Sequence, residues 1–404
     1  MAVATVALVA LNLATSSAED KPDRHLDEAR RILREVPLID GHNDVPWQYR
    51  RRSNDFSALD LARNTSELKL AMHTDIPRLR AGVVGGQFWS VYVPVSPSGA
   101  EAVQATIEQI DVVHRMCARY PETFELALTA NDVERIHHNG KIASLIGMEG
   151  GHSINNSLGT LRMMYRLGAR YMTLTHVKNT NWADAAGDVA KHHGLTPFGE
   201  DVIREMNRLG MLVDLSHVTD DTMRAALRVS KAPVIFSHSS ARALCDHVRN
   251  VPDDVLRLTA TNGGVVMVCF LPSYVTEIDR KDGELAKAER ARLELLRDKD
   301  ADMISAGMKE WRKTHPDPNA ATLNDVADHI DHIRKTIGVE HIGIGSDFDG
   351  FTGAVGGLED VSKYPDLFAE LLRRGYSEDD IKKIAGLNLL RTLRGAERVS
   401  REMQ

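Results

Sequence analysis

The chain has 404 residues, with 57 acidic and 50 basic side chains and a formal net charge of −7. Because acids and bases are interspersed and no basic block or nucleic-acid-binding motif is present, the sequence argues against a nucleic-acid partner. Hydrophobic residues make up 43% of the chain, which is ordinary for a globular protein. The length would allow two or three domains, but single α/β barrels also exceed 250 residues.

The first eighteen residues have the pattern of an export signal. Residues 2–14 are almost wholly apolar, and Ser16, Ser17 and Ala18 provide the small side chains of a cleavage site. The usual early lysine or arginine is missing, so an apolar N-terminus without a targeting role is the alternative. We expect a periplasmic or secreted protein if the signal functions and a cytoplasmic one otherwise. The polar residues 401–404 predict no lipid anchor.

Eight short apolar runs follow, and segments with helical spacing separate them. Several runs are continuous rather than alternating, as in strands that are buried on both faces. The predicted strands are residues 37–40, 84–93, 142–148, 171–175, 211–215, 233–237, 264–269 and 341–346, and the clearest predicted helices are 158–167, 198–209, 220–229 and 323–337. This alternation predicts an α/β fold, a closed (β/α)8 TIM barrel that spans residues 19–404 as one domain.

Residues 279–318 interrupt this rhythm between the seventh and eighth predicted strands. The segment is long and highly charged, and its pattern is helical. A helical excursion into solvent is the interpretation that its charge favours. A partial lid is the alternative, because a connection that leaves the C-terminal end of a barrel strand lies on the active-site side.

Histidines and carboxylates stand at the ends of most of these predicted strands. Barrel enzymes draw their catalytic residues from the C-terminal ends of different strands. A single histidine at such a place is more often a structural hydrogen-bonding residue, but a joint occurrence at several strand ends favours a metal site. The residues at strand ends are His42, Asp44, Glu149, His176, His217, His238 and Asp347. By contrast, we expect His137, His138, His192 and His193 in loops and His329 and His332 on a helix surface, without function.

This combination of side chains suits metal-assisted hydrolysis. Histidine and carboxylate ligands without cysteine favour zinc or another borderline divalent cation. His42 and Asp44 are two residues apart, so both side chains face the same way in an extended chain. His217 and His238 can hold a second ion, and a glutamate between the two sites can bridge them. Two ions about 3.5–4 Å apart can share a water and lower its pKa from about 16 toward about 7.

Longer motifs around these positions resemble the membrane (renal) dipeptidase family, peptidase family M19. The motifs keep their order over about residues 29–393, and they are 40–47, 149–153, 174–176, 214–217, 236–240, 249–254, 345–350 and 357–365. The resemblance implies a TIM barrel of the metal-dependent hydrolase type with two zinc ions per chain. It also implies dipeptide substrates and a homodimer.

The resemblance also implies a role for each metal ligand. His42 and Asp44 would hold one zinc ion, and His217 and His238 the other. Glu149 would bridge the two ions, so that a hydroxide shared between them attacks the peptide bond.

Three further residues would contact the substrate. By the resemblance, His176 would contact the substrate carbonyl and the developing oxyanion, and Arg249 would bind the terminal carboxylate, which a guanidinium fork suits. Asp347 would hold the free amino group and transfer protons. Tyr274 is expected to line the pocket. Whether D-residues at the C-terminal position and β-lactams are also substrates stays open.

Two other interpretations are compatible with a strand-end metal site. One is another two-metal barrel hydrolase, such as a lactonase, phosphotriesterase or deaminase. These enzymes often use His-x-His and a carboxylated lysine, whereas this chain has His-x-Asp at residues 42–44. The other is a binding protein without catalysis, which would need neither the full ligand set nor Asp347.

Overall fold

Nine parallel strands form the centre of the computed structural model, which describes residues 23–96, 98–296 and 300–404. Their order is β2-β1-β9-β8-β7-β6-β5-β4-β3, and pairing of β2 with β4 closes eight of them into a barrel. The strands are β1 (Leu38–Asn43), β2 (Val84–Ser90), β3 (Phe124–Leu126), β4 (Ile142–Glu149), β5 (Ala169–Thr173), β6 (Leu212–Asp214), β7 (Ile235–Phe236), β8 (Val265–Val268) and β9 (Ile342–Ile344). The predicted (β/α)8 TIM barrel is confirmed. The expected signal at residues 1–18 lies outside the described residues.

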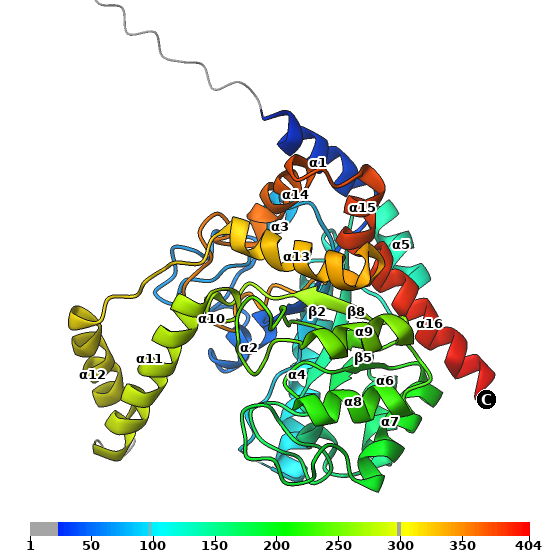
Figure 1. Ribbon diagram of the computed structural model, residues 1–404, viewed down its shortest axis with the longest axis horizontal. Coiled ribbons are helices and arrows are strands. Elements are labelled where there is room, and N and C mark those ends of the chain that lie inside the picture. Colours follow the sequence, from blue (N-terminus) through cyan, green and yellow to red (C-terminus); the bar gives the residue numbers. More distant parts are fainter. Residues whose placement is uncertain (1–22, 97, 297–299) are drawn as a thin grey trace, which may run out of the picture.

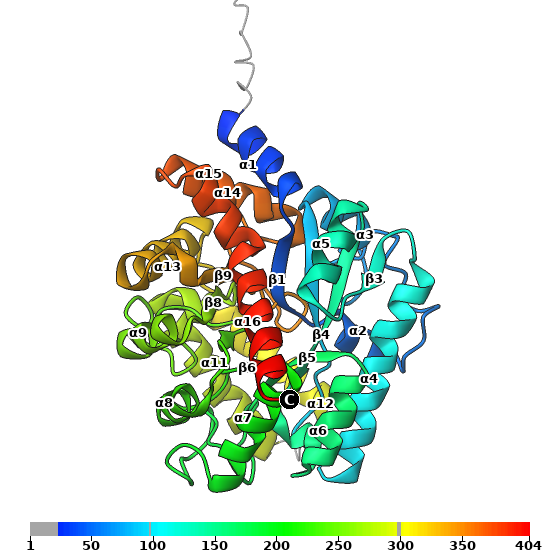
Figure 2. The same cartoon turned by 90° about the vertical axis from the view of Figure 1, so that its right-hand side faces the viewer.

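Helices surround the barrel and connect its strands (Figures 1 and 2). The α-helices are α1 (Arg24–Glu35), α2 (Val45–Arg50), α3 (Ile76–Ala81), α4 (Ala100–Arg119), α5 (Ala130–His138), α6 (Leu158–Arg166), α7 (Pro197–Leu209), α8 (Asp220–Val229), α9 (Asp253–Asn262), α10 (Pro272–Val275), α11 (Glu277–Leu296), α12 (Ala301–Thr314), α13 (Leu323–Ile337), α14 (Tyr364–Arg373), α15 (Glu378–Lys382) and α16 (Asn388–Glu402). Short 3₁₀ or π turns are η1 (Gly151–Ile154), η2 (Val339–His341), η3 (Val361–Lys363) and η4 (Lys383–Leu387).

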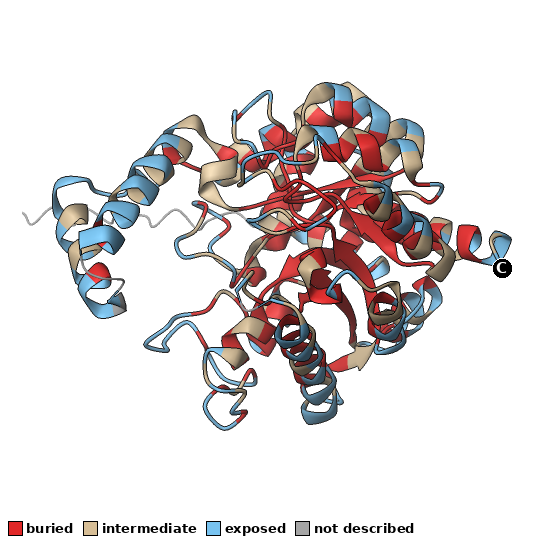
Figure 3. Ribbon diagram, turned by 90° about the horizontal axis from the view of Figure 1, so that it is seen from below, coloured by how far each residue is buried: buried red, intermediate tan, exposed pale blue. Residues whose placement is uncertain are grey.

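Local sequence explains the boundaries of these elements. The Thr196 side chain accepts a hydrogen bond from the backbone N–H of Gly199 and so caps α7, whose first residue is proline. Gly210 ends this helix in the left-handed conformation, with φ of 82°. Every residue of β1, β2 and β4 is buried, which explains their continuous apolar runs. Figure 3 shows these buried strands at the centre and exposed residues on the outer faces of the helices.

Aromatic side chains fill the barrel interior next to the polar site. Tyr171, on β5, is fully buried and packs against Phe88 of β2 with ring centroids 4.9 Å apart. On the neighbouring strand β4, a Cβ at position 147 would overlap the Tyr171 ring, so only glycine fits there. Tyr171 is thereby held where its hydroxyl reaches the polar end of the barrel.

Three expectations need correction. The sequence pattern missed β3, which has only three residues, two of them half-buried, and pairs with β4 beside the closed barrel. His137 and His138 lie in α5, not in a loop. His329 is buried, not on the helix surface, because its ring nitrogens meet the backbone N–H of Ala241 at 3.0 Å and the carbonyl of Val275 at 3.0 Å.

The charged segment between β8 and β9 forms two long helices. α11 and α12 project from the barrel as a hairpin with largely exposed surfaces (Figures 1 and 3). Neither helix lines the substrate cavity described below, whereas Tyr274 of the short helix α10 does. In this structure the hairpin therefore extends into solvent and does not cover the substrate cavity. Within the described residues, no helix combines the length and the apolar character that a membrane crossing needs.

Candidate metal centre and substrate pocket

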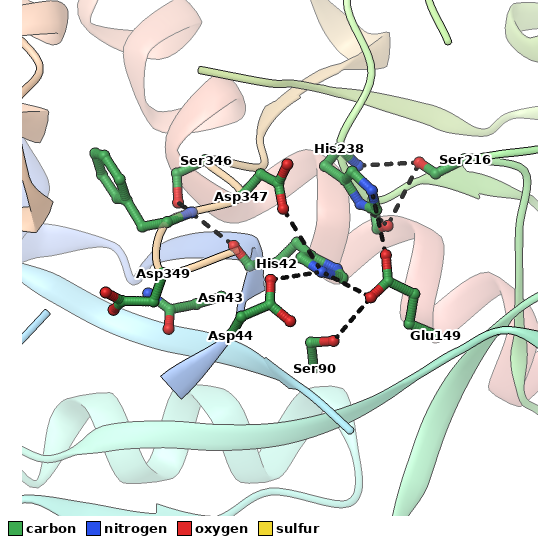
Figure 4. A network of polar contacts seen from close by, with 12 residues as sticks. His42, Asn43, Asp44, Ser90, Glu149, Ser216, His238, Ser346, Asp347 and Asp349 are labelled. Carbon is green, nitrogen blue, oxygen red and sulfur yellow. Dashed lines mark hydrogen bonds and ion pairs between the residues drawn. The ribbon is translucent and has the colours of Figure 1, made fainter. Parts of the chain in front are cut away.

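The structure brings the predicted ligands together at the C-terminal end of the barrel (Figure 4). His42 lies on β1 and Asp44 at the N-cap of α2, so one short segment supplies both. Glu149 is the last residue of β4. The loops after β5, β6, β7 and β9 supply His176, His217, His238 and Asp347.

Glu149 stands between two sets of histidines. Its Oε2 lies 3.7 Å from His42 Nε2, and its Oε1 lies 3.0 Å from His217 Nε2 and 3.6 Å from His238 Nε2. Ser90 Oγ donates to Oε2 at 3.3 Å and holds the carboxylate in this orientation (Figure 4). The two oxygens of one carboxylate thus face different histidines.

Three groups of side chains are close enough to hold a metal ion, with ligand atoms within 4.8 Å of one another. Glu149 belongs to two of these groups and His42 to two, as expected of neighbouring sites that share ligands. The groups are His42, Glu149 and His238; Glu149, His176 and His217; and His42, Asp44 and Asp347. His176 and Asp347, which were expected to contact the substrate, belong to two of these groups. His217 and His238, which were expected to hold the same ion, belong to different groups. The division of ligands between two ions therefore stays a prediction.

His42 has the surroundings of a metal ligand. Its Nδ1 lies 2.8 Å from the Tyr171 hydroxyl, and this hydroxyl donates to the carbonyl of Gly41. Nδ1 therefore carries a proton, and Nε2 is the nitrogen that can bind a metal once it is deprotonated. Nε2 is buried and has no hydrogen-bond partner among the described residues. Burial lowers the pKa of His42, but the carboxylates of Glu149 and Asp44 outweigh it and raise the pKa to about 10. The site thus favours a positive charge at this nitrogen.

His238 is oriented in the same way by a hydrogen-bonded chain. Ser237 Oγ donates to Asp214 Oδ2 at 2.7 Å and lies 2.8 Å from His238 Nδ1. The serine oxygen therefore accepts the Nδ1 proton. His238 Nε2, the nitrogen that a metal would bind, accepts a hydrogen bond from Arg249 Nη2 at 2.8 Å in this structure. His238 Nε2 lies 2.9 Å from His217 Nε2. Burial and nearby cations hold the pKa of both histidines well below the ordinary value, so both rings are neutral, as ligands must be.

Three residues at the site have an unusual backbone conformation. His217, Asp347 and Asp349 have φ of 71°, 66° and 66°, a region that non-glycine residues rarely adopt. Such strain persists only where the surrounding structure enforces it, and it is concentrated at functional sites. The geometry therefore singles out these two loops independently of their side-chain chemistry.

A cavity of about 330 Å³ opens above this cluster. Its polar residues include Asp44, Glu149, His176, His217 and Asp347, and Tyr274 lines it as expected. The sequence interpretation missed its apolar wall, which consists of Trp47, Tyr92, Val177, Leu271 and Phe351. Tyr92 was open to prediction, because it stands at the end of the run that forms β2.

Arg249 lies behind the cavity wall rather than on it. Its side chain is buried, with Nη2 2.8 Å from His238 Nε2 and the guanidinium 5.3 Å from the centre of the Tyr274 ring. Nε and Nη1 have no hydrogen-bond partner among the described residues. Two buried and unpartnered N–H groups can receive a carboxylate, which fits the expected role of Arg249.

Asp347 and Asp349 share one loop but face different partners. Asp347 Oδ1 lies 3.9 Å from His42 Nε2, and burial raises the pKa of Asp347 well above its ordinary value. Asp349 accepts a hydrogen bond from the backbone N–H of His73 at 2.7 Å and points away from the cluster (Figure 4). Of these two aspartates, only Asp347 lines the cavity above the metal-ligand cluster.

Known proteins resemble this chain over nearly its whole length. Dipeptidase verJ of Clonostachys rogersoniana is 42% identical over 394 residues, which are 95% of this chain and 90% of that protein. The probable dipeptidase PvdM from Pseudomonas aeruginosa shares the fold, with a TM-score of 0.78 and 24% identity over 94% of this chain and all of that chain. A metallo peptidase from Rhodobacter sphaeroides, liganded with a phosphinate mimic of L-Ala-D-Ala, has a TM-score of 0.72 and 25% identity over 89% of this chain and 99% of that chain.

The family model described as membrane dipeptidase, peptidase family M19, matches residues 26–404. This match confirms the resemblance that the motifs indicated, and it favours peptide-bond hydrolysis over the lactonase, phosphotriesterase and deaminase alternatives. The chain therefore belongs to the membrane dipeptidase family, peptidase family M19, and is a dipeptidase with the fold of a metallopeptidase.

Proposed function

We propose that this dipeptidase holds two zinc ions and hydrolyses dipeptides whose amino and carboxyl ends are both free. One observation carries the proposal: Glu149 directs one oxygen toward His42 and the other toward His217 and His238. A carboxylate in this place can bridge two ions, with His42 and Asp44 on one side and the two other histidines on the opposite side.

The donor set fits zinc. Imidazole nitrogens with carboxylate oxygens suit this borderline cation, and the unpartnered Nε2 of His42 is a buried donor that a cation would satisfy. When bound, such ions supply a water of lowered pKa and polarise the carbonyl group that is attacked.

The protein's own residues would orient the substrate and move its protons. Arg249 would bind the terminal carboxylate through its two unpartnered N–H groups. His176, which lines the cavity, would donate a hydrogen bond to the carbonyl oxygen as negative charge develops there. Asp347 would hold the amino group and give a proton to the leaving amine, without which the amine cannot depart.

An arginine at one end and a carboxylate at the other would measure the length of a dipeptide. We include D-residues at the C-terminal position in the proposal, because the Rhodobacter relative is liganded with a mimic of L-Ala-D-Ala. β-Lactams belong to the same proposal, since their strained amide can take the place of the peptide bond.

A substrate panel tests this proposal. We expect hydrolysis of L-Ala-L-Ala and L-Ala-D-Ala, and little hydrolysis of tri-alanine, of N-acetyl-Ala-Ala or of Ala-Ala amide. Ampicillin added to the panel measures β-lactam opening. Turnover of the dipeptide amide at the rate of the free dipeptide would contradict the proposed length selection.

The location and assembly of the protein are a separate part of the proposal. The apolar residues 2–14 and the small residues before Glu19 support export with cleavage after Ala18, and the family resemblance supports a homodimer. N-terminal sequencing of the mature protein and light scattering would test the two points. An uncleaved N-terminus or a monomer in solution would contradict them.

A further inference from the structure

A second cavity adjoins the substrate pocket. Its volume is about 730 Å³, more than twice that of the pocket over the metal cluster. Trp47, Leu271, Gly350 and Phe351 line both cavities, so these four residues form the boundary between them. The proposed chemistry needs only the smaller cavity, and the larger one has no role in it.

Two cations without partners line this second cavity. The side chains of Arg51 and Lys69 are exposed, and neither has an ion-pair or hydrogen-bond partner among the residues that the structure describes. The acidic residue of the lining is Asp349, which is buried and already accepts a hydrogen bond from the backbone of His73. His73 in turn directs its Nε2 to the carbonyl of Gly353 at 2.9 Å. The cavity therefore has unneutralised positive charge at its mouth.

Part of the cavity wall is apolar, and hydrogen bonds join its two sides. Leu70, Met72 and Phe351 offer surfaces against which methylene groups can pack. Arg52 joins the two sides, because its guanidinium donates to the carbonyl of Gln48 at 2.7 Å and to the carbonyl of Leu70 at 3.4 Å. The segment that carries Lys69 is thus held against α2.

The position of the boundary indicates which part of a substrate would enter. Asp347 and Phe351 lie in the same loop at the boundary side of the pocket, whereas Arg249 lies behind His238 and Tyr274. With the amino group at Asp347 and the carboxylate at Arg249, the side chain of the N-terminal residue is the one next to the boundary. This orientation of the substrate rests on the proposed function.

We propose that the second cavity is the subsite for the side chain of the substrate's N-terminal residue, and that it selects long acidic side chains. The carboxylate of such a side chain would reach Arg51 and Lys69 while its methylene groups pack between Phe351 and Met72. A short side chain would not enter the second cavity, because it ends before the boundary between the two cavities. An acidic side chain would be preferred, because Arg51 and Lys69 have no other partner among the described residues.

The test compares Glu-Ala with Gln-Ala, which differ in charge but hardly in shape. One exposed ion pair raises kcat/KM about 1.5- to 5-fold, so two cations predict that kcat/KM for Glu-Ala exceeds that for Gln-Ala by roughly 2- to 25-fold. The double variant Arg51→Gln, Lys69→Gln should bring this ratio to about 1 and leave hydrolysis of Ala-Ala unchanged. Lys309→Gln removes an exposed cation on the distant α12 and should leave the ratio as it is in the wild type.

Two further measurements separate the possible failures. In the wild type the ratio should fall between low and high salt, because exposed charges are screened, and this check needs no variant. A wild-type ratio of 1 or less, or a ratio unchanged in the double variant, overturns the subsite. Absence of Ala-Ala hydrolysis would instead refute the proposed function, and calorimetric titration of Glu-Ala and Gln-Ala would then still measure the preference.

Discussion

Replacing Asp347 by asparagine tests whether this carboxyl group protonates the leaving amine. Asp347 lines the cavity, and burial raises its pKa well above the ordinary value, so it can keep a proton where an exposed aspartate would not. Asparagine has the same size but cannot transfer a proton. We expect kcat to fall by about 10²–10⁴, the range for general acid–base groups, which corresponds to roughly 3–5 kcal/mol. Metal content and KM should stay within a few-fold of the wild type.

Asp349→Asn is the matched control, since it lies two residues away with the same positive φ. The amide oxygen of asparagine can still accept the His73 N–H that Asp349 Oδ1 accepts at 2.7 Å, but the NH2 group would replace the buried Oδ2, which has no partner among the described residues. The substitution should therefore lower the free energy of unfolding by about 1–3 kcal/mol and hardly change kcat. Steady-state kinetics, metal analysis and denaturant unfolding of both variants form the assay. An inactive Asp349→Asn beside an active Asp347→Asn would show that the wrong carboxylate was chosen, and loss of metal from Asp347→Asn would make Asp347 a ligand instead.

Three further predictions concern the ends of the pocket and the metal-free site. Arg249→Ala should lower kcat/KM for Ala-Ala about 10- to 150-fold, because it removes a contact worth roughly 1.5–3 kcal/mol. It should also reduce the ratio of kcat/KM for Ala-Ala to kcat/KM for Ala-Ala amide. An unchanged ratio would exclude Arg249 as the residue that binds the substrate carboxylate. Gly350→Ala should weaken metal binding and activity together, because a Cβ would lie 2.7 Å from Asp347 Oδ1 and closer still to Asp44 Oδ2. Gly356→Ala should not, because a Cβ there would meet the carbonyl oxygen of Ala321 at 3.6 Å, an ordinary van der Waals contact. Zinc binding at pH 7 should release protons and weaken as the pH falls, because His42 with a pKa of about 10 is protonated in the metal-free site; equal affinity at pH 6 and 8, measured by calorimetry, would contradict this.

The barrel was predictable because its strands are buried on both faces. All eight predicted runs coincide with strands of the closed barrel, and their continuous apolar pattern is the direct result of that burial. β3 lies beside the barrel with two of its three residues half-buried, so it lacks this pattern. His329 was misplaced for a related reason. Its polar ring is satisfied by backbone groups of Ala241 and Val275, which are distant in sequence, so no local pattern reveals its burial.

The convergence of the site residues followed from topology, but their detailed contacts did not. Parallel strands bring their C-terminal ends to one side, so strand-end histidines and carboxylates had to meet. The sequence does not tell which oxygen of Glu149 faces which histidine, or that Tyr171 and Ser237 set the protonation of His42 and His238. Phe351 in the apolar wall was missed because its local pattern does not distinguish it from a core residue, whereas the place of Tyr92 at the end of the β2 run was a signal that could have been used.

Metal content together with hydrolysis of Ala-Ala, in the wild type and in Glu149→Ala, tests the central claim most directly. The wild type should bind about two zinc ions per chain, and Glu149→Ala should lose the most metal of any single ligand variant, because one oxygen of Glu149 faces His42 and the other faces His217. Glu122→Ala, which removes an exposed glutamate far from the cluster in sequence, is the control and should retain both metal and activity. Wild-type metal content and activity in Glu149→Ala would contradict a bridging role for this carboxylate and, with it, the proposed two-metal centre.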